Sequence, residues 1–541
     1  MKLIKQKSSV LSCILFFVFA LMMALTISNK INFHVDEISS YTLANHKGEQ
    51  FLTFEDCQTY APPSDVFMES MAVDINNRFD YANVIANQSA DVHPPLYYLI
   101  LHTICSLLPG TFSKWYAGAI NIAFGLATLF FVRKLMRTLT IAGGGGTYLG
   151  LLVNLISIVF ICSVGVHTAV PFLRMYMMAM CWVTATAFLL ANQIGKPIHT
   201  HQFYISIFVV TFLGAMTHYY CIVYTVLSSA IYVVALLFQK KWKDAGGLCV
   251  VMMMSGIVSI AAFPAMLKHI FFGYRGEEAV ENLSSLENYS ERIQAFFDFL
   301  SQQMFGGVLG AILVFVVLLL VCELILKYFQ EPSGQKEQEG VQITDAIKVE
   351  VQKMFCVALP SILYFLLISK IAAYVSDRYI FPIYAVCLVW VSALVAMLVR
   401  LACSQKVSIL SLCIIFSVAI SAGWQNYSGE YLYRNTSNLL ETAATHADVD
   451  CLCIYSSKGR VQPSFEEISR YKSVTFVPMD QVDRLLQLDM ASDQEMVVLL
   501  VGIDNEQDYI CQIMEMYPQL NSSQSIGSHG YGSSYYLSWE M

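Results

Sequence analysis

Long apolar runs recur along most of the chain and are separated by short polar segments. The first run, residues 10–27, contains no charged residue and is about long enough to cross a bilayer as one helix. Comparable runs continue to Trp424, so the pattern predicts about eleven membrane-spanning helices. The predicted spans are residues 10–27, 115–133, 147–165, 177–194, 203–217, 221–238, 246–266, 305–327, 351–372, 379–400 and 407–424.

One apolar run, residues 96–108, is too short to cross comfortably. A further crossing there would also move the cationic segment that begins at Arg133 to the other side of the membrane. We therefore expect a half-inserted or surface-lying helix.

The pattern changes after Trp424, where short β-rich runs alternate with segments of helical spacing. The expected strands are residues 450–456, 473–478, 496–503 and 533–541, and the expected helices are residues 464–472, 480–488 and 506–517. This alternation predicts a small α/β domain. The expected organisation is a membrane domain at 1–424, which includes polar outer loops at 32–95 and 268–303, and an α/β domain at 425–541.

Composition supports a polytopic membrane protein. Hydrophobic residues make up 56% of the 541 residues and charged residues only 13%, against about 25% charged in a soluble protein. The net charge of -8 argues against a nucleic-acid partner. No small-residue cleavage site follows the first run, so we interpret it as a retained helix rather than a removed signal peptide.

Lysine and arginine gather in alternate loops, which predicts the orientation. Lys2, Lys5 and Lys7 precede the first span, and further cations cluster at 133–137 and 240–243. Because cytoplasmic loops carry the excess of Lys and Arg, we expect a cytoplasmic N-terminus and an extracytoplasmic C-terminal domain in a plasma membrane.

Five polar clusters then fall at helix ends on the same, outer side. They are His34-Asp36-Glu37, Asp91-His93 with the following "PPLYY", Arg174-Tyr176, His218 in "THYY", and Asp377-Arg378-Tyr379. Each has an ordinary explanation by itself, such as a solvated carboxylate, a helix start at proline or a headgroup anchor. Together they provide a base, cations and an amphipathic groove at one membrane face.

These motifs resemble the GT-C glycosyltransferases that use polyprenyl-phosphate sugars, the branch with protein O-mannosyltransferases and aminoarabinose transferases. The carboxylate pair after the first span and "HPPLYY" carry the resemblance, and "RMY", "THYY" and "DRYIFP" are compatible with it. It covers about residues 10–400 and implies transfer from a polyprenyl-phosphate donor to an unidentified glycan, lipid or protein. Leu173 stands where many relatives have an acidic residue or alanine before "RMY", which leaves a divalent metal as an open possibility.

The chemistry of such a reaction assigns expected roles. Asp36 is the candidate general base for an inverting displacement, and Glu37 is expected to orient Asp36 or the acceptor. The expected supports for the acceptor side are His34, His93, Tyr97 and His218. The expected phosphate-binding residues are Arg174, Tyr176, Arg378, Tyr379 and Lys268, since cations at helix ends bind phosphate at the interface.

Two other classes of protein remain open. A transporter normally places charged groups near the bilayer midplane and often has internal repeats, whereas these polar groups lie at one face. A non-catalytic membrane scaffold would explain the tail but not the carboxylates of the first loop. Cys451 and Cys453 have CxC spacing, but no second pair follows at zinc spacing.

Overall fold

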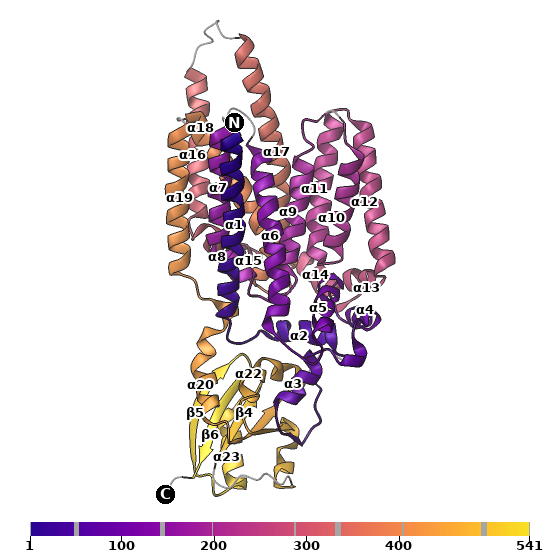
Figure 1. Ribbon diagram of the computed structural model, residues 1–541, viewed down its shortest axis with the longest axis vertical. Helices are drawn as coiled ribbons and strands as arrows, with labels where there is room; N and C mark the ends of the chain where they lie inside the picture. Colours follow the sequence, from indigo (N-terminus) through magenta and orange to yellow (C-terminus); the bar gives the residue numbers. More distant parts are fainter. Residues whose placement is uncertain are drawn as a thin grey trace.

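The computed structural model describes residues 2–47, 53–140, 146–196, 198–285, 288–329, 337–402, 405–487 and 495–539. Figure 1 shows upright helices packed side by side into a bundle, with a sheet beyond one end of it. The N-terminus lies toward the opposite end of the bundle from the sheet, which contains the C-terminal segment. We call the end that carries the sheet the outer end.

Each predicted span coincides with a helix of the bundle. These helices are α1 (Lys2–Ser28), α6 (Lys114–Leu139), α7 (Gly146–Cys162), α9 (Tyr176–Ala191), α10 (His201–Ala215), α11 (Tyr219–Phe238), α12 (Trp242–Ala262), α16 (Leu309–Phe329), α17 (Glu337–Ile371), α18 (Tyr384–Ala402) and α19 (Gln405–Gln425). In the described part of the chain, seven helices are long and apolar enough to cross a membrane, or eight if α16 and the helix before it form one broken span. The helices α7, α9 and α10 are shorter apolar helices. The predicted all-α polytopic membrane protein is confirmed.

Burial distinguishes central from peripheral helices. Of the apolar stretch of α18, 89% is buried inside the protein, whereas only 22% of the apolar stretch of α12 is buried. A helix that is apolar all round and buried belongs in the middle of a bundle. The α18 helix, entered through "DRYIFP", therefore forms part of the core on which the outer-end site is built.

The two loops predicted at 32–95 and 268–303 contain short helices at the outer end. The first segment folds as α2 (Val35–Asn45), α3 (Ser64–Met71), η1 (Ile75–Asn77) and α4 (Tyr81–Ala90), and the second as α13 (Ala265–Phe271), α14 (Tyr274–Ser284) and α15 (Tyr289–Phe305). The predicted short helix is α5 (Leu96–Leu107), which lies among them (Figure 1), and α8 (Val164–Ala169) precedes α9. The α15 helix bends away from α16 by 85°, so it lies across the helix ends.

The C-terminal segment contributes five strands to a six-stranded sheet with the order β1-β3-β2-β4-β6-β5. Its strands are β1 (Gln58–Tyr60), β2 (Asp450–Tyr455), β3 (Ser473–Pro478), β4 (Glu495–Val501), β5 (Ser522–His529) and β6 (Gly532–Ser538). The associated helices are α20 (Ser437–Thr445), α21 (Lys458–Val461), α22 (Phe465–Ile468), η7 (Met479–Gln487) and α23 (Glu506–Met516). Residue 488 of the predicted helix 480–488 and the last two residues of the predicted strand 533–541 lie outside the described residues.

The edge strand β1 comes from the first outer loop and was not predicted. It pairs antiparallel with β3, whereas β2 pairs in parallel with both β3 and β4. Successive residues of β2 face opposite sides, so Cys451 and Cys453 join the core shared with the membrane domain, and Leu452 and Ile454 face the separate core under α23. A strand buried on both faces is apolar at almost every position, which explains the run "CLCIY".

Candidate active site

A helix cap places Asp36 at the outer end of the bundle. His34 is the N-cap of α2, and its Nδ1 accepts a hydrogen bond from the Asp36 N–H at 3.1 Å. The Glu37 carboxylate in turn accepts from the His34 N–H at 2.6 Å. This reciprocal cap fixes the first turn of α2, where neighbouring side chains diverge by about 100°. Asp36 and Glu37 therefore face different surroundings.

Two arginines from distant segments meet Asp36. Arg378, in η2 (Asp377–Tyr379), contacts the Asp36 carboxylate at 2.5 Å. Arg174, in the turn before α9, donates to the Asp36 carbonyl oxygen at 2.9 Å and to Ser40 Oγ at 3.0 Å. The Asp36 side chain is 31% exposed, so this carboxylate is accessible from outside. A carboxylate and two guanidinium groups thus share one small region.

The surrounding charges set the protonation states of this cluster. Burial by itself would raise the pKa of Asp36, but Arg174 and Arg378 hold that pKa below its usual value. Burial lowers the pKa of His34 to about 4, so its imidazole is neutral at neutral pH. Asp36 is consequently ionised, and its ion pair with Arg378 stabilises the negative charge.

His93 connects Arg174 to a second carboxylate. Its Nδ1 lies 2.7 Å from Asp91 Oδ2, and its Nε2 lies 3.4 Å from Arg174 Nη2. The His218 ring is next, with its centroid 6.1 Å from that of His93. Because Asp91 orients one ring nitrogen, the other is directed toward the arginine.

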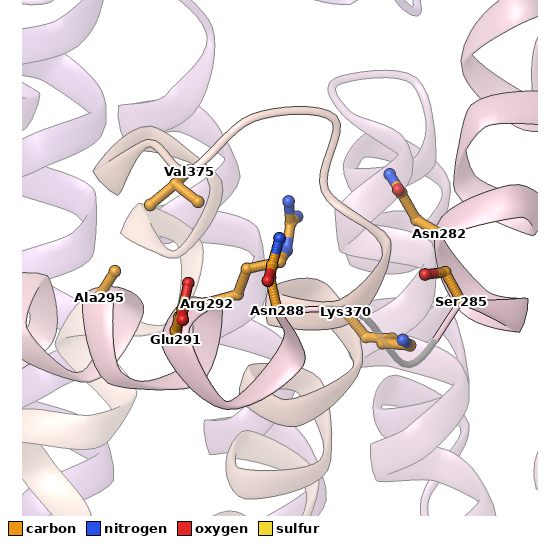
Figure 2. Close-up of a pocket in the computed structure, with 8 residues that line it drawn as sticks. All are labelled: Asn282, Ser285, Asn288, Glu291, Arg292, Ala295, Lys370 and Val375. Atoms are coloured by element: carbon orange, nitrogen blue, oxygen red, sulfur yellow. The ribbon is translucent and has the colours of Figure 1, made fainter.

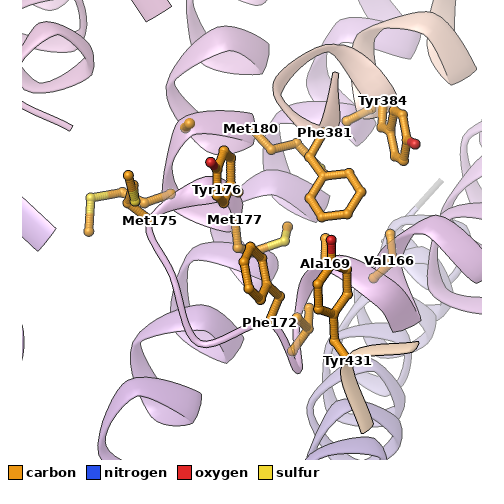
Figure 3. Packing of buried hydrophobic residues seen from close by; sticks show 14 of the residues in the cluster. Val166, Ala169, Phe172, Met175, Tyr176, Met177, Met180, Phe381, Tyr384 and Tyr431 are labelled. Carbon is orange, nitrogen blue, oxygen red and sulfur yellow. The ribbon is translucent and has the colours of Figure 1, made fainter. Parts of the chain in front are cut away.

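Aromatic side chains form the apolar wall of the site. Phe172 stacks on Tyr176, with ring centroids 5.6 Å apart, and on Tyr431, at 4.2 Å. Figure 3 shows these rings together with Phe381 from the "DRYIFP" segment. The Arg378 guanidinium lies over the Tyr379 ring, 5.4 Å from the ring centroid. Tyr379, one of the two tyrosines predicted at the phosphate site, is therefore next to a cation.

Glu37 faces away from the accessible region. It is fully buried, its carboxylate forms an ion pair with Lys30 at 2.9 Å, and its other oxygen accepts from the Leu173 N–H at 2.7 Å. Burial raises the pKa of Glu37 and lowers that of Lys30. Glu37 thereby ties α2 to the end of α1 and to the segment that carries Arg174, and it has no direct contact with the Asp36 carboxylate.

The segment that carries Arg378 is fixed by its neighbour Asp377. The Asp377 carboxylate accepts from Gln303 Nε2 of α15 at 2.6 Å and from the Tyr431 hydroxyl at 2.9 Å. The Tyr431 carbonyl oxygen in turn accepts from Lys30 Nζ at 2.5 Å. Tyr431 follows the last membrane helix and links the segment with Arg378 to the buried Lys30–Glu37 pair.

Two predicted site residues lie apart from the accessible cluster. Tyr97 is fully buried, and its hydroxyl has no hydrogen-bond partner in the part of the chain that the structure describes. The adjacent Tyr98 contacts Arg174 instead, through its hydroxyl at 3.3 Å. Lys268 is exposed on α13, whereas its neighbour His269 is buried, with its Nε2 at 3.2 Å from the Ser89 carbonyl oxygen. The roles of Tyr97 and Lys268 stay predictions.

Sequence reasoning missed the residues that hold this site together, chiefly Lys30, Tyr98, Gln303 and Tyr431. The spacing of Lys30 and Glu37 was a usable signal, because a cation so near the end of an apolar span requires a partner if it is buried. Tyr431 gave no such signal, since its contacts lie far away in the sequence.

A metal would need several ligands at one point. In the described segments, no three His, Cys, Asp or Glu side chains gather in this way. At the position before "RMY", Leu173 contributes only its backbone N–H, to Glu37. We therefore assign no step to a metal.

Comparisons with known proteins show the fold. No family model matches the sequence, and no curated protein matches it. Among solved structures, the chain is similar to ArnT from Cupriavidus metallidurans in the apo state, with a TM-score of 0.52 and 10% identity over 98% of both chains. The structure of ArnT bound to undecaprenyl phosphate gives a TM-score of 0.51 and 10% identity over 97% of both chains. The protein therefore has the same fold as ArnT.

Proposed function

We propose that this protein is a membrane glycosyltransferase that moves a hexose or pentose from a polyprenyl-phosphate donor to an acceptor hydroxyl at the outer face of the plasma membrane. The observation that carries the proposal is the accessible Asp36 carboxylate, held 2.5 Å from Arg378 and beside Arg174 at one end of a membrane bundle. The shared fold with a protein that binds undecaprenyl phosphate supports it.

The two arginines suit the donor's phosphate. A polyprenyl chain stays in the bilayer, so its phosphate lies at the helix ends, where Arg174 and Arg378 are. Guanidinium groups bind phosphate through paired N–H donors. The Nε atoms of both arginines are buried without a hydrogen-bond partner among the described residues, so each guanidinium retains a donor.

Asp36 serves as the general base in one displacement step. The acceptor oxygen attacks the anomeric carbon and gives its proton to the Asp36 carboxylate. The bond from that carbon to the phosphate oxygen breaks, and its electron pair leaves with polyprenyl phosphate, whose added charge the arginines stabilise. A single displacement inverts the anomeric configuration.

Donor binding also prepares the base. Arg378 donates to the Asp36 carboxylate, and a donor phosphate would compete with that carboxylate for the same guanidinium. If Arg378 turned toward the phosphate, the pKa of Asp36 would rise and the carboxylate would accept a proton more readily, although Arg174 would still hold that pKa down.

The test is sugar transfer by the purified protein. A set of polyprenyl-phosphate sugars is incubated with membrane glycans, lipids and peptides as acceptors, and released polyprenyl phosphate is measured. We expect release that requires both protein and acceptor, together with a product of inverted configuration. Transfer only from nucleotide sugars, or no release with any donor, would contradict the proposal.

A further inference from the structure

A polar pocket whose lining does not include Asp36 lies at the outer end. It has a volume of about 490 Å³, and its lining includes Asn282, Asn288, Arg292, Lys370 and Val375. Figure 2 shows these side chains, contributed by α14, by the start of α15, by the end of α17 and by the connection that follows it. None of them belongs to the cluster around Asp36.

Lys370 is the unusual residue of this pocket. It is only 9% exposed, yet no ion pair among the described residues joins its ammonium group to a carboxylate. Its one described contact is the face of Tyr289, at 4.8 Å from the ring centroid. A lysine at a helix end is often a headgroup anchor that extends into water, but this side chain is buried. A buried cation without an anion is costly, so the pocket suits an anionic ligand.

Arg292 supplies a second cation, and its position is fixed. Its Nε donates to the Ser369 carbonyl oxygen at 2.9 Å, and its Nη2 donates to the Ala372 carbonyl oxygen. These contacts occupy one edge of the guanidinium, and the remaining Nη1 donors are available to a ligand. The carboxylate of Glu291 lies at the exposed rim of the same pocket.

The surroundings place the pocket at the membrane surface. Phe271 and Phe272 of the α13–α14 hairpin are 64% and 75% exposed, and Leu283, next to the pocket residue Asn282, is 54% exposed. Exposed apolar side chains at the end of a membrane bundle insert among lipid headgroups. Lipid headgroups, which carry phosphate, are the abundant anions at this depth.

We propose that the Arg292–Lys370 pocket binds a phosphate group carried by a molecule at the membrane surface, separate from the donor phosphate at Arg174 and Arg378. A phospholipid headgroup and a phosphorylated acceptor glycan present the same chemistry. The α15 helix connects the two regions, because Arg292 donates to the Ser369 carbonyl oxygen at the end of α17 and Gln303 donates to Asp377.

Lys370→Gln is the informative variant, since Lys370 makes no described hydrogen bond that the change would break, whereas Arg292 supports two carbonyl groups. The melting temperature of the purified protein in neutral detergent is measured while phosphatidylglycerol, phosphatidylcholine or a water-soluble sugar phosphate is titrated. Lys472→Gln, at an exposed lysine of the C-terminal sheet, is the matched control. The parent and Lys370→Gln are also prepared with Asp36→Asn, so that the measured melting temperature does not depend on turnover.

We expect stabilisation by one phosphate ligand in the parent and in Lys472→Gln, with an apparent affinity about tenfold weaker in Lys370→Gln because the charged donor is lost, a difference of about 1.4 kcal/mol. An effect confined to phosphatidylglycerol identifies a lipid headgroup, and an effect of the sugar phosphate identifies the acceptor. Equal affinities for the parent and Lys370→Gln, or no stabilisation of the parent, would overturn the inference. Neither result bears on sugar transfer, so failure here is distinct from failure of the proposed function.

Discussion

Arg378 has two partners in the proposed reaction, the Asp36 carboxylate at rest and the donor phosphate during transfer. It contacts the Asp36 carboxylate through Nη1 alone, whereas a phosphate can accept from two parallel donors of a planar guanidinium. A lysine at the same position would keep the charge but lose this geometry. Replacing Arg378 by lysine therefore distinguishes phosphate recognition from simple anchoring at the headgroups.

Arg378→Lys should weaken use of the donor by about tenfold or more, because a point charge cannot replace a bidentate contact. The measurement is the donor concentration dependence of transfer. Arg434→Lys, at an outer arginine after the last membrane helix, is the control and should behave like the parent. If Arg378→Lys retains the parent's donor affinity and rate, Arg378 is an anchor and the phosphate must bind elsewhere.

His34 is expected to make the folding stability depend on pH. Its pKa is about 4 in the folded protein and about 6.5 when exposed, so the unfolded chain takes up a proton first as the pH falls. Folding stability from this residue is complete above pH 6.5 and declines toward pH 4. His34→Asn keeps a side chain that caps the helix but does not titrate.

Thermal unfolding of the parent and of His34→Asn between pH 7 and pH 4 checks this prediction. The parent should lose more stability than the variant over that range, by on the order of 2 to 3 kcal/mol. Parallel pH profiles for the two proteins would show that folding does not lower the pKa of His34.

At the scale of elements, α2 is held by the buried Glu37–Lys30 pair. Glu37→Gln leaves Lys30 as a buried cation with only the Tyr431 carbonyl oxygen and aromatic rings beside it. Breaking one partner of a buried pair costs about 3 to 5 kcal/mol. We therefore expect Glu37→Gln to lower the melting temperature of the purified protein clearly.

The double variant Lys30→Met with Glu37→Gln removes the stranded charge and should recover part of that stability. Turnover per folded molecule should fall less in Glu37→Gln than in Asp36→Asn, since the Glu37 carboxylate is buried and paired with Lys30 rather than placed beside Asp36. An equal loss of turnover would mean that the roles of the two carboxylates have been assigned in the wrong order.

The sequence predicted Asp36, Arg174, Arg378 and His93 as one group because each ends or begins an apolar run on the same side. The different surroundings of Asp36 and Glu37 were not predictable, since adjacent residues diverge in a helix and oppose each other in a strand. The capping box that decides between these uses a histidine, which is not among the usual N-cap residues.

At the scale of the whole molecule, hydropathy predicted the membrane bundle because the bilayer imposes a length on each helix. It did not predict β1, whose three residues pair with β3 more than 400 residues later. Such pairing depends on contacts across the fold and leaves no periodic signal in so short a segment. The C-terminal sheet is thus built partly from the loop that carries Asp36.

The orientation of the molecule is open to a labelling test. Ser89→Cys and Ser523→Cys should react with a membrane-impermeant thiol reagent in intact cells, and Lys243→Cys should react only after lysis. Because Cys511 is exposed on the C-terminal domain, the test uses a Cys511→Ser background. Labelling of Lys243→Cys in intact cells would invert the proposed topology.

The most direct measurement is transfer from a synthetic polyprenyl-phosphate sugar by the parent, by Asp36→Asn and by Asp65→Asn, a matched carboxylate at an exposed position of the same outer segment. Asparagine keeps the size and one oxygen of aspartate but cannot take the acceptor's proton. We predict that Asp36→Asn retains folding and donor binding while its turnover falls by roughly 10²- to 10⁴-fold, and that Asp65→Asn matches the parent. Near-parental turnover of Asp36→Asn would contradict the assignment of Asp36 as the base.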